Sequence, residues 1–209
     1  MSESITINID QVALPGDLNI PAKAKALVLF VHGSGSSRLS PRNCFVAQVL
    51  NDAGIATLLI DLLSKKEDQD YETRFDIPLL TKRVQGILRW LEQDPRTSKL
   101  SLGLFGASTG AASMIFAAIK NKKVKALVSR GGRVDLAVDM IKDLSAPLLL
   151  IVGEHDFEVL RLNKRVYDEA VCEKKLTIID SATHLFEEEG TLEQVADIAK
   201  DWFLEKLSG

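Results

Sequence analysis

The chain has 209 residues, of which 46 % are apolar and 26 % charged, so it is long enough to bury a sizeable core in one domain. Its net charge of −3 gives no electrostatic reason to expect a nucleic acid or an anionic membrane as a partner. No apolar run approaches the roughly 20 residues that span a bilayer, and no secretory signal opens the chain. The two cysteines, Cys44 and Cys172, lie far apart without metal-ligand spacing. We therefore expect a cytoplasmic protein with free thiols and with no metal or cofactor.

The first part of the chain predicts a pair of edge strands and then an alternation of strands and helices. Residues 4–14 alternate between apolar and polar, which is typical of a half-buried strand. Pro15-Gly16-Asp17 predicts a turn, and residues 18–20 the start of a short returning strand. The run 26–31 is continuously apolar, as in a strand buried on both faces. Next come a helix over about 41–53, a strand over 55–63, a polar solvated loop over 64–74 and a helix over about 76–93.

The alternation continues to the end of the chain. The expected strands are 100–105, 124–129, 147–152 and 175–179, and the expected helices about 109–120, 135–144, 158–171 and 191–207. This order predicts an α/β fold whose sheet is mainly parallel and twisted, with helices on both faces and right-handed crossovers. The N-terminal pair would lie antiparallel at one edge. No break in composition suggests a second domain, so we expect one domain over residues 1–209.

The segment Gly106-Ala107-Ser108-Thr109-Gly110 has the form of a nucleophile elbow between a strand and an Ala-rich helix. A serine hydroxyl is a weak nucleophile until a neighbouring base takes its proton, and it must stand clear of the backbone to meet an acyl carbon. A sharp turn with glycines on both sides achieves this. The alternative is an ordinary loop in which Ser108 caps a helix.

Ligands of open α/β sheets bind beyond the carboxyl ends of the parallel strands. The polar residues expected at those ends are His32, Ser34, Asp61, Ser108, Arg130, Arg133, His155, Asp156 and His184. A nucleophile, an acid and a histidine thus follow one another in the order Ser, Asp, His. That is the order in which the α/β-hydrolase arrangement uses them.

Five stretches carry a resemblance to the α/β-hydrolase superfamily and, within it, to the dienelactone-hydrolase-like group: LVLFVHGSGSS, LGLFGASTGAA, LVSRGGR, PLLLIVGEHD and ATHLFEEEG. The resemblance extends from about residue 20 to residue 207. It implies an α/β-hydrolase fold with Ser108 as nucleophile, Asp156 as the acid and His184 as the base. Dienelactone hydrolases proper carry cysteine as the nucleophile, where this chain has serine.

These three residues have complementary roles. His184 would accept the Ser108 proton and later protonate the leaving group, while Asp156 would hold the imidazole in the right tautomer. A tetrahedral oxyanion needs two donors. We expect one donor to be the backbone N–H of Thr109. The other is expected from the loop after the first parallel strand, where the N–H of Ser34 is the first choice and that of Gly35 the second.

Several assignments have rivals. Asp61 and Asp135 also follow strands and are alternative acids. His155 is expected to point away from the site, and His32 to shape the oxyanion loop rather than to transfer protons. The run Glu187-Glu188-Glu189 is typical of a solvated helix start.

Two arginines have open roles. Arg130 and Arg133 bind an acidic group of the substrate, or they form a salt bridge with a nearby carboxylate such as Asp135.

The sequence favours a serine hydrolase that cleaves an ester or similar acyl compound through an acyl-enzyme. Many proteins of this fold insert a lid between the fourth parallel strand and the next one. Here that segment, residues 131–147, is short, so we expect a minimal lid or none and an open, shallow site. The expected partner is a small-molecule acyl substrate, and the protein a monomer or homodimer. The alternatives are a lyase or cofactor-free peroxidase on the same scaffold, or a non-catalytic binding protein.

Overall fold

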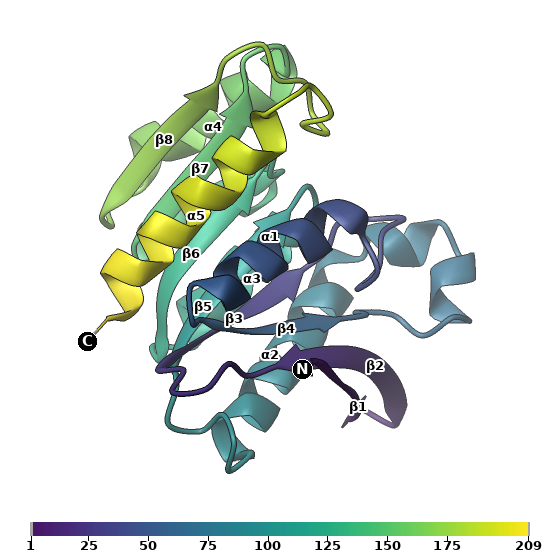
Figure 1. Cartoon of the computed structure of the whole chain (residues 1–209). Helices are drawn as coiled ribbons and strands as arrows, with labels where there is room; N and C mark the ends of the chain where they lie inside the picture. The colour runs from purple at the N-terminus through teal and green to yellow at the C-terminus, as the bar shows by residue number, and fades with distance from the viewer. Residues whose placement is uncertain (1, 209) are drawn as a thin grey trace.

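The computed structural model describes residues 2–208 and is built around an eight-stranded sheet in the order β1-β2-β4-β3-β5-β6-β7-β8 (Figure 1). The strands are β1 (Ser2–Ile9), β2 (Val12–Asn19), β3 (Ala26–Val31), β4 (Ala56–Ile60), β5 (Ser101–Ala107), β6 (Val124–Arg130), β7 (Leu148–Gly153) and β8 (Lys174–Ile179). The pairs β1–β2 and β2–β4 are antiparallel, and all pairs from β4 to β8 are parallel. The predicted mainly parallel sheet with an antiparallel edge is confirmed.

Helices cover both faces of the sheet, which gives the three layers of an α/β-hydrolase fold. α1 (Pro41–Asp52) and α5 (Thr191–Leu207) pack on one face, in front of the sheet in Figure 1. α2 (Ile77–Gln93), α3 (Gly110–Lys120) and α4 (Phe157–Glu169) pack on the other. Two hydrophobic cores therefore lie on opposite sides of the sheet.

The central strands supply both cores in alternation. In β3, every residue is buried, with Leu27 and Leu29 in the α2/α3 core and Val28 and Phe30 in the α1/α5 core. The rings of Phe30 and Phe105, on the neighbouring strands β3 and β5, lie 4.9 Å apart between their centroids. A continuous apolar run is therefore what this strand requires, because neither face meets water.

The N-terminal hairpin corrects the expected turn. Pro15-Gly16-Asp17 lies inside β2, where Gly16 pairs with Ile60 of β4 and Asp17 with Leu59. The chain reverses instead at Asp10 and Gln11, both with positive φ (50° and 65°), between the paired residues Ile9 and Val12. Two residues of positive φ match the right-handed twist of the flanking strands, so this tight turn replaces the proline–glycine turn.

The polar segment after β4 is more ordered than the expected solvated loop. It holds two 3₁₀ turns, η1 (Glu67–Gln69) and η2 (Glu72–Phe75). Ser64 and Glu67 cap each other: the Ser64 N–H donates to the Glu67 carboxylate at 2.8 Å, and the Glu67 N–H donates to the Ser64 hydroxyl at 3.2 Å. Glu67 also pairs with the buried Arg83 of α2 at 2.7 Å. These contacts anchor the segment to the body of the fold.

Two further expectations shift in detail. β4 spans Ala56–Ile60, so residue 55 and residues 61–63 of the predicted strand 55–63 lie outside it. The expected helix over 135–144 is the 3₁₀ segment η3 (Val134–Asp143), which packs against α3 and α4. η3 occupies the stretch where a lid would be inserted.

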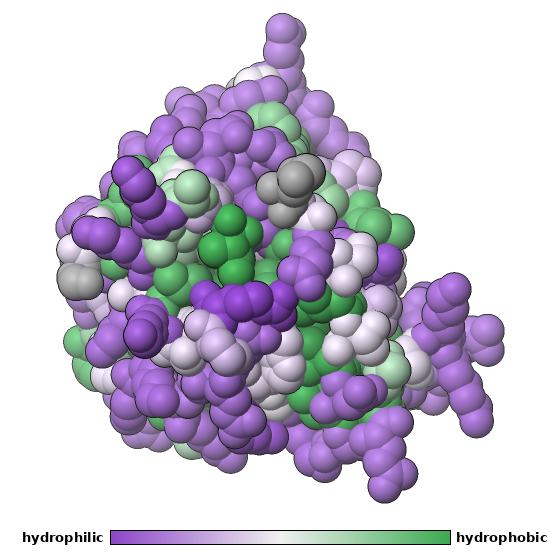
Figure 2. Space-filling view, turned by 60° about the horizontal axis from the view of Figure 1, so that its bottom comes forward, coloured by the Kyte–Doolittle hydropathy of each residue, from purple (hydrophilic) through white to green (hydrophobic). Residues whose placement is uncertain are grey.

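The face of the molecule drawn in Figure 2 is mostly hydrophilic. Figure 2 shows hydrophobic residues near the centre and toward the lower right of that face, among hydrophilic ones. Within residues 2–208, no helix combines the length and the apolar character needed to cross a bilayer.

Candidate active site

Ser108 lies on a sharp turn between β5 and α3. Its φ is +49°, in the left-handed region that side chains rarely adopt. A Cβ on Gly106 would lie 2.7 Å from Cα of Ala111, and a Cβ on Gly110 would lie 2.4 Å from the carbonyl oxygen of His32. Both flanking positions therefore need glycine, because only backbone without a side chain fits. The turn has the strand–turn–helix context expected of a nucleophile elbow.

Backbone contacts hold the elbow against its neighbours. The Ser108 N–H donates to the carbonyl of Arg130 at 3.2 Å, and the Ser108 carbonyl accepts from the N–H of Arg133 at 2.9 Å. On the other side, a Cβ on Gly33 would lie 2.9 Å from Cβ of Ser108. The loop after β3 thus rests against the serine, and the serine backbone is tied to the end of β6.

His184 and Asp156 form a close pair at the same edge. Nδ1 of His184, on the loop after β8, lies 2.6 Å from Oδ2 of Asp156, at the start of α4 after β7. An ionised carboxylate can only accept, so Nδ1 carries the proton and Nε2 is left as an acceptor. The Asp156 side chain is 13 % exposed and that of His184 40 %, so the imidazole reaches solvent while its acid is shielded.

The imidazole lies beside the strand that holds the elbow. A Cβ on Gly131, directly after β6, would be 3.4 Å from both Cε1 and Nδ1 of His184. Since β6 also bonds the Ser108 backbone through Arg130, the histidine and the serine loop meet at the end of this strand. A side chain at Gly131 would touch the imidazole and would be strained by the backbone, whose φ is +52°.

The two alternative acids, Asp61 and Asp135, each pair with an arginine. Asp61 accepts from the backbone N–H of Arg38 at 2.7 Å and from its guanidinium at 2.9 Å. Asp135 binds Arg133 through two hydrogen bonds, at 2.9 and 3.0 Å, and this contact raises the pKa of Arg133. Asp156 is therefore the acid that the structure places beside a histidine.

His32 and His155 both contact groups other than the Asp156–His184 pair. The Nε2 atom of His32 accepts from the Leu62 N–H at 3.1 Å, so its Nδ1 carries the proton toward the Gly33 carbonyl, 3.0 Å away. With both ring nitrogens occupied by backbone, His32 joins the ends of β3 and β4 and shapes the loop beside Ser108. The half-exposed His155 lies 3.9 Å from the Glu154 carboxylate.

Burial lowers the pKa of His32 from its ordinary 6.5. The unfolded chain therefore binds a proton more readily than the folded one, so stability from this group is present above about pH 6.5 and is lost as pH falls below it. We expect His32→Gln to destabilise the protein and to flatten this loss between about pH 7.5 and 5.5. Chemical denaturation at both pH values measures it, with the surface variant His155→Gln as control. An undiminished slope in His32→Gln would contradict the assignment.

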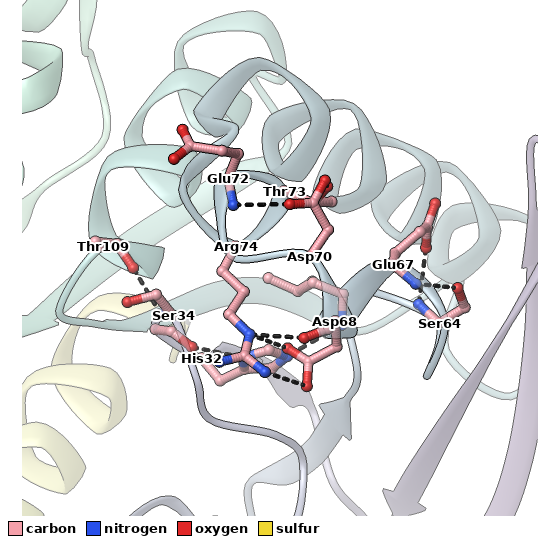
Figure 3. Close-up of polar contacts among 12 residues, drawn as sticks. His32, Ser34, Ser64, Glu67, Asp68, Asp70, Glu72, Thr73, Arg74 and Thr109 are labelled. Carbon is pink, nitrogen blue, oxygen red and sulfur yellow. Dashed lines mark hydrogen bonds and ion pairs between the residues drawn. The ribbon is translucent and has the colours of Figure 1, made fainter.

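Ser34, whose N–H is an expected oxyanion donor, lies on the loop after β3 and contacts Thr109. Its N–H donates to the hydroxyl of Thr109 at 2.8 Å and so has a partner in this state (Figure 3). The backbone N–H of Thr109 has no hydrogen-bond partner among residues 2–208.

An ion pair lies beside His32 in Figure 3. It joins Arg74 and Asp68, with 3.1 Å between Nε and Oδ1.

The two arginines after β6 differ in their partners. Arg133 forms a salt bridge with Asp135, which is the second of the two roles considered for it from the sequence. Arg130 is only 8 % exposed, and within residues 2–208 no carboxylate pairs with it; its buried Nη1 has no partner. Burial and the nearby Arg42 lower the pKa of Arg130 to about 10. Arg130 is thus a buried cation without a counter-charge at the edge that carries the elbow.

Glu188 has a role that sequence reasoning missed. Its carboxylate accepts from the N–H of Thr183 at 3.1 Å and from the Thr183 hydroxyl at 2.7 Å, which lowers the pKa of Glu188. Neighbouring Glu187 pairs with Arg42 of α1 at 3.3 Å. The acidic run is therefore more than a solvated helix start, since it orders the loop that carries His184. The short spacing from Thr183 to Glu188 is the signal that could have suggested it.

The comparison with protein families matches residues 14–205 to a model described as "Dienelactone hydrolase family". The chain belongs to the dienelactone hydrolase family. A crystal structure of a dienelactone hydrolase from Anabaena variabilis is 47 % identical, with a TM-score of 0.96 over 99 % of this chain and 98 % of that one. Est1E from Butyrivibrio proteoclasticus, 16 % identical with a TM-score of 0.80 over 99 % of both chains, shares the fold.

A relative in Mycobacterium tuberculosis has a different kind of name. It is called "Putative phosphoribosyl transferase" and is 49 % identical over 208 residues, which are 99 % of this chain but 47 % of that protein. The chain therefore spans about half the length of this curated relative. The name describes a protein with as much sequence again outside the matched region.

Proposed function

We propose that this member of the dienelactone hydrolase family is a serine hydrolase of esters or similar acyl compounds, with Ser108, His184 and Asp156 as its catalytic triad. The observation that carries the proposal is the 2.6 Å contact between His184 Nδ1 and Asp156 Oδ2 at the edge of the sheet where Ser108 stands on its elbow. Family membership and the esterase-like fold support the same class of reaction.

The proposed reaction has two halves. The Ser108 hydroxyl oxygen attacks the acyl carbon while Nε2 of His184 takes its proton, and the carbonyl electron pair moves to oxygen. The imidazolium, stabilised by the Asp156 carboxylate, gives that proton to the leaving group as the tetrahedral intermediate collapses to an acyl-enzyme. Water then attacks in the same way and releases the acid. The first half leaves Ser108 acylated and His184 neutral. In the second half His184 takes a proton from the attacking water and gives it to Ser108 Oγ as the acyl bond breaks, which restores both residues.

A fluorophosphonate probe followed by peptide mapping tests the nucleophile directly. We expect a single adduct on Ser108, together with hydrolysis of short p-nitrophenyl esters. The buried Ser113 on α3, which has no hydrogen-bond partner within residues 2–208, is the matched serine that should stay unlabelled. A protein that neither labels nor turns over any ester would favour the binding-protein alternative.

We further propose that the substrate is small and carries an anionic group. The short η3 segment and the 40 % exposure of the His184 side chain favour an open site. Arg130, buried and without a counter-charge beside the elbow, would gain a partner from a substrate carboxylate. Arg133 is already paired and is not assigned this role.

Replacing Arg130 with Gln tests the anion preference. A hydrogen-bonded charge is worth about 1.5–3 kcal/mol, so KM for an anionic ester such as a dicarboxylic acid monoester should rise about 10- to 100-fold. KM for its neutral analogue should change little, since the neutral group makes no such bond. Arg133→Gln is the control and should not discriminate between the two substrates. Equal rises in KM for both esters in Arg130→Gln would show that Arg130 has a structural role.

A further inference from the structure

The side chain of Thr109 lies where the oxyanion donors are expected, yet it does not do what a threonine at this position usually does. Thr109 precedes α3 at the N-cap position, where a threonine hydroxyl commonly accepts from an N–H of the first turn. Here the hydroxyl makes no such capping bond. It accepts instead from the N–H of Ser34, 75 residues away in sequence, at 2.8 Å (Figure 3).

The proton of this hydroxyl is uncommitted. A hydroxyl has one proton to donate and two lone pairs to accept with. The Ser34 N–H fills one lone pair, and among residues 2–208 no acceptor takes the Thr109 hydroxyl proton. The side chain is shielded, since Thr109 is 5 % exposed, and it follows the nucleophile directly in the chain. Gly33, the residue before Ser34, in turn lies against Ser108.

We propose that the Thr109 hydroxyl is itself a donor of the oxyanion hole, alongside the Thr109 backbone N–H, and that Ser34 is a positioning residue acting through it. The inference rests on the proposed serine hydrolase function. The Ser34 N–H holds and polarises the hydroxyl oxygen, which makes its O–H a stronger donor. A site built only from backbone donors would work equally well with valine at position 109, whereas the proposed site needs a hydroxyl there.

The donor works without transferring its proton. As Ser108 Oγ bonds to the acyl carbon, its proton moves to His184 Nε2 and the carbonyl electron pair moves to the oxygen. That oxygen then accepts two hydrogen bonds, from the N–H and from the O–H of Thr109. When the leaving group departs with the proton from His184, the carbonyl forms again and both bonds weaken. The hydroxyl therefore stabilises the transition state more than the bound substrate.

Thr109→Val is the decisive variant, because valine keeps the shape and removes the hydroxyl. The same change frees the Ser34 N–H to donate to the oxyanion itself. If the Thr109 hydroxyl is the donor, activity falls; if the Ser34 N–H is the donor, activity stays the same or rises. With the hydroxyl as donor, kcat and kcat/KM for p-nitrophenyl acetate fall together by about 10²–10³, with KM nearly unchanged. Thr109→Ala, which adds no bulk, should show the same loss. Thr109→Ser, which keeps a hydroxyl, should stay within a few-fold of the wild type.

The control is Thr177→Val on β8, where the hydroxyl that is removed has no partner within residues 2–208. It should leave kcat unchanged, and thermal unfolding midpoints check that every variant is folded. If Thr109→Val and Thr109→Ala match or exceed the wild type, the freed Ser34 N–H serves directly and the inference is overturned, while the serine hydrolase assignment stands. If the wild type itself neither hydrolyses esters nor labels at Ser108, the assignment fails and the inference fails with it.

Discussion

Ser108→Ala is expected to abolish ester hydrolysis, with a loss in kcat of about four to six orders of magnitude, and to leave the protein folded. The catalytic loss follows because an alanine has no oxygen to attack the acyl carbon. The folded state should persist because Ser108 is only half-buried and its hydroxyl supports no hydrogen bond within residues 2–208. The elbow itself depends on the glycines at 106 and 110, which stay in place. Steady-state kinetics and a circular dichroism melt measure the two effects.

The matched control is Ser113→Ala, in the helix that follows the elbow. Ser113 is fully buried and its hydroxyl has no partner within residues 2–208, so this variant removes a hydroxyl without touching the proposed triad. It should keep full activity. If Ser108→Ala retained more than a small fraction of the wild-type rate on a good ester, Ser108 would not be the nucleophile.

Asp156→Asn is expected to lower kcat by about 10⁴ with a small effect on the fold. In the wild type, the carboxylate accepts from Nδ1 of His184 at 2.6 Å and leaves Nε2 free to take the serine proton. An asparagine amide in the same place donates to Nδ1, which forces the proton onto Nε2, the wrong nitrogen for a base. It also removes the negative charge that stabilises the imidazolium. Steady-state kinetics on a p-nitrophenyl ester measures the loss, and a thermal melt checks the fold.

Asp61→Asn and Asp135→Asn are the controls for the acid. Each weakens an ion pair with an arginine, Arg38 or Arg133, and we expect effects on stability that are small beside the loss in Asp156→Asn. If Asp61→Asn or Asp135→Asn caused a large loss in kcat while Asp156→Asn stayed nearly active, Asp156 would not be the acid of the triad.

The sequence by itself determined the alternation of strands and helices, because the apolar periods of 2 and 3.6 residues are local properties. The burial of β3 on both faces follows from its continuous apolar run, and the limits of α5, residues 191–207, agree with the structure at both ends. The elbow was predictable for the same reason: the glycines that allow it stand within two residues of Ser108. Where a competing local signal was present the prediction failed, as at Pro15-Gly16, which pairing with β4 holds inside a strand.

Only the tertiary structure decided which of several equivalent residues lies beside which. Asp61, Asp135 and Asp156 all follow strands, and their order along the chain does not say which lies near His184; the packing of β7 beside β8 does. The same holds for Arg130 and Arg133, since one side chain is buried without a partner and the other meets Asp135. The Ser34–Thr109 contact joins residues 75 positions apart. Such pairings depend on how β3, β5 and their loops meet in space, and a contact across parallel strands leaves no local period in the sequence.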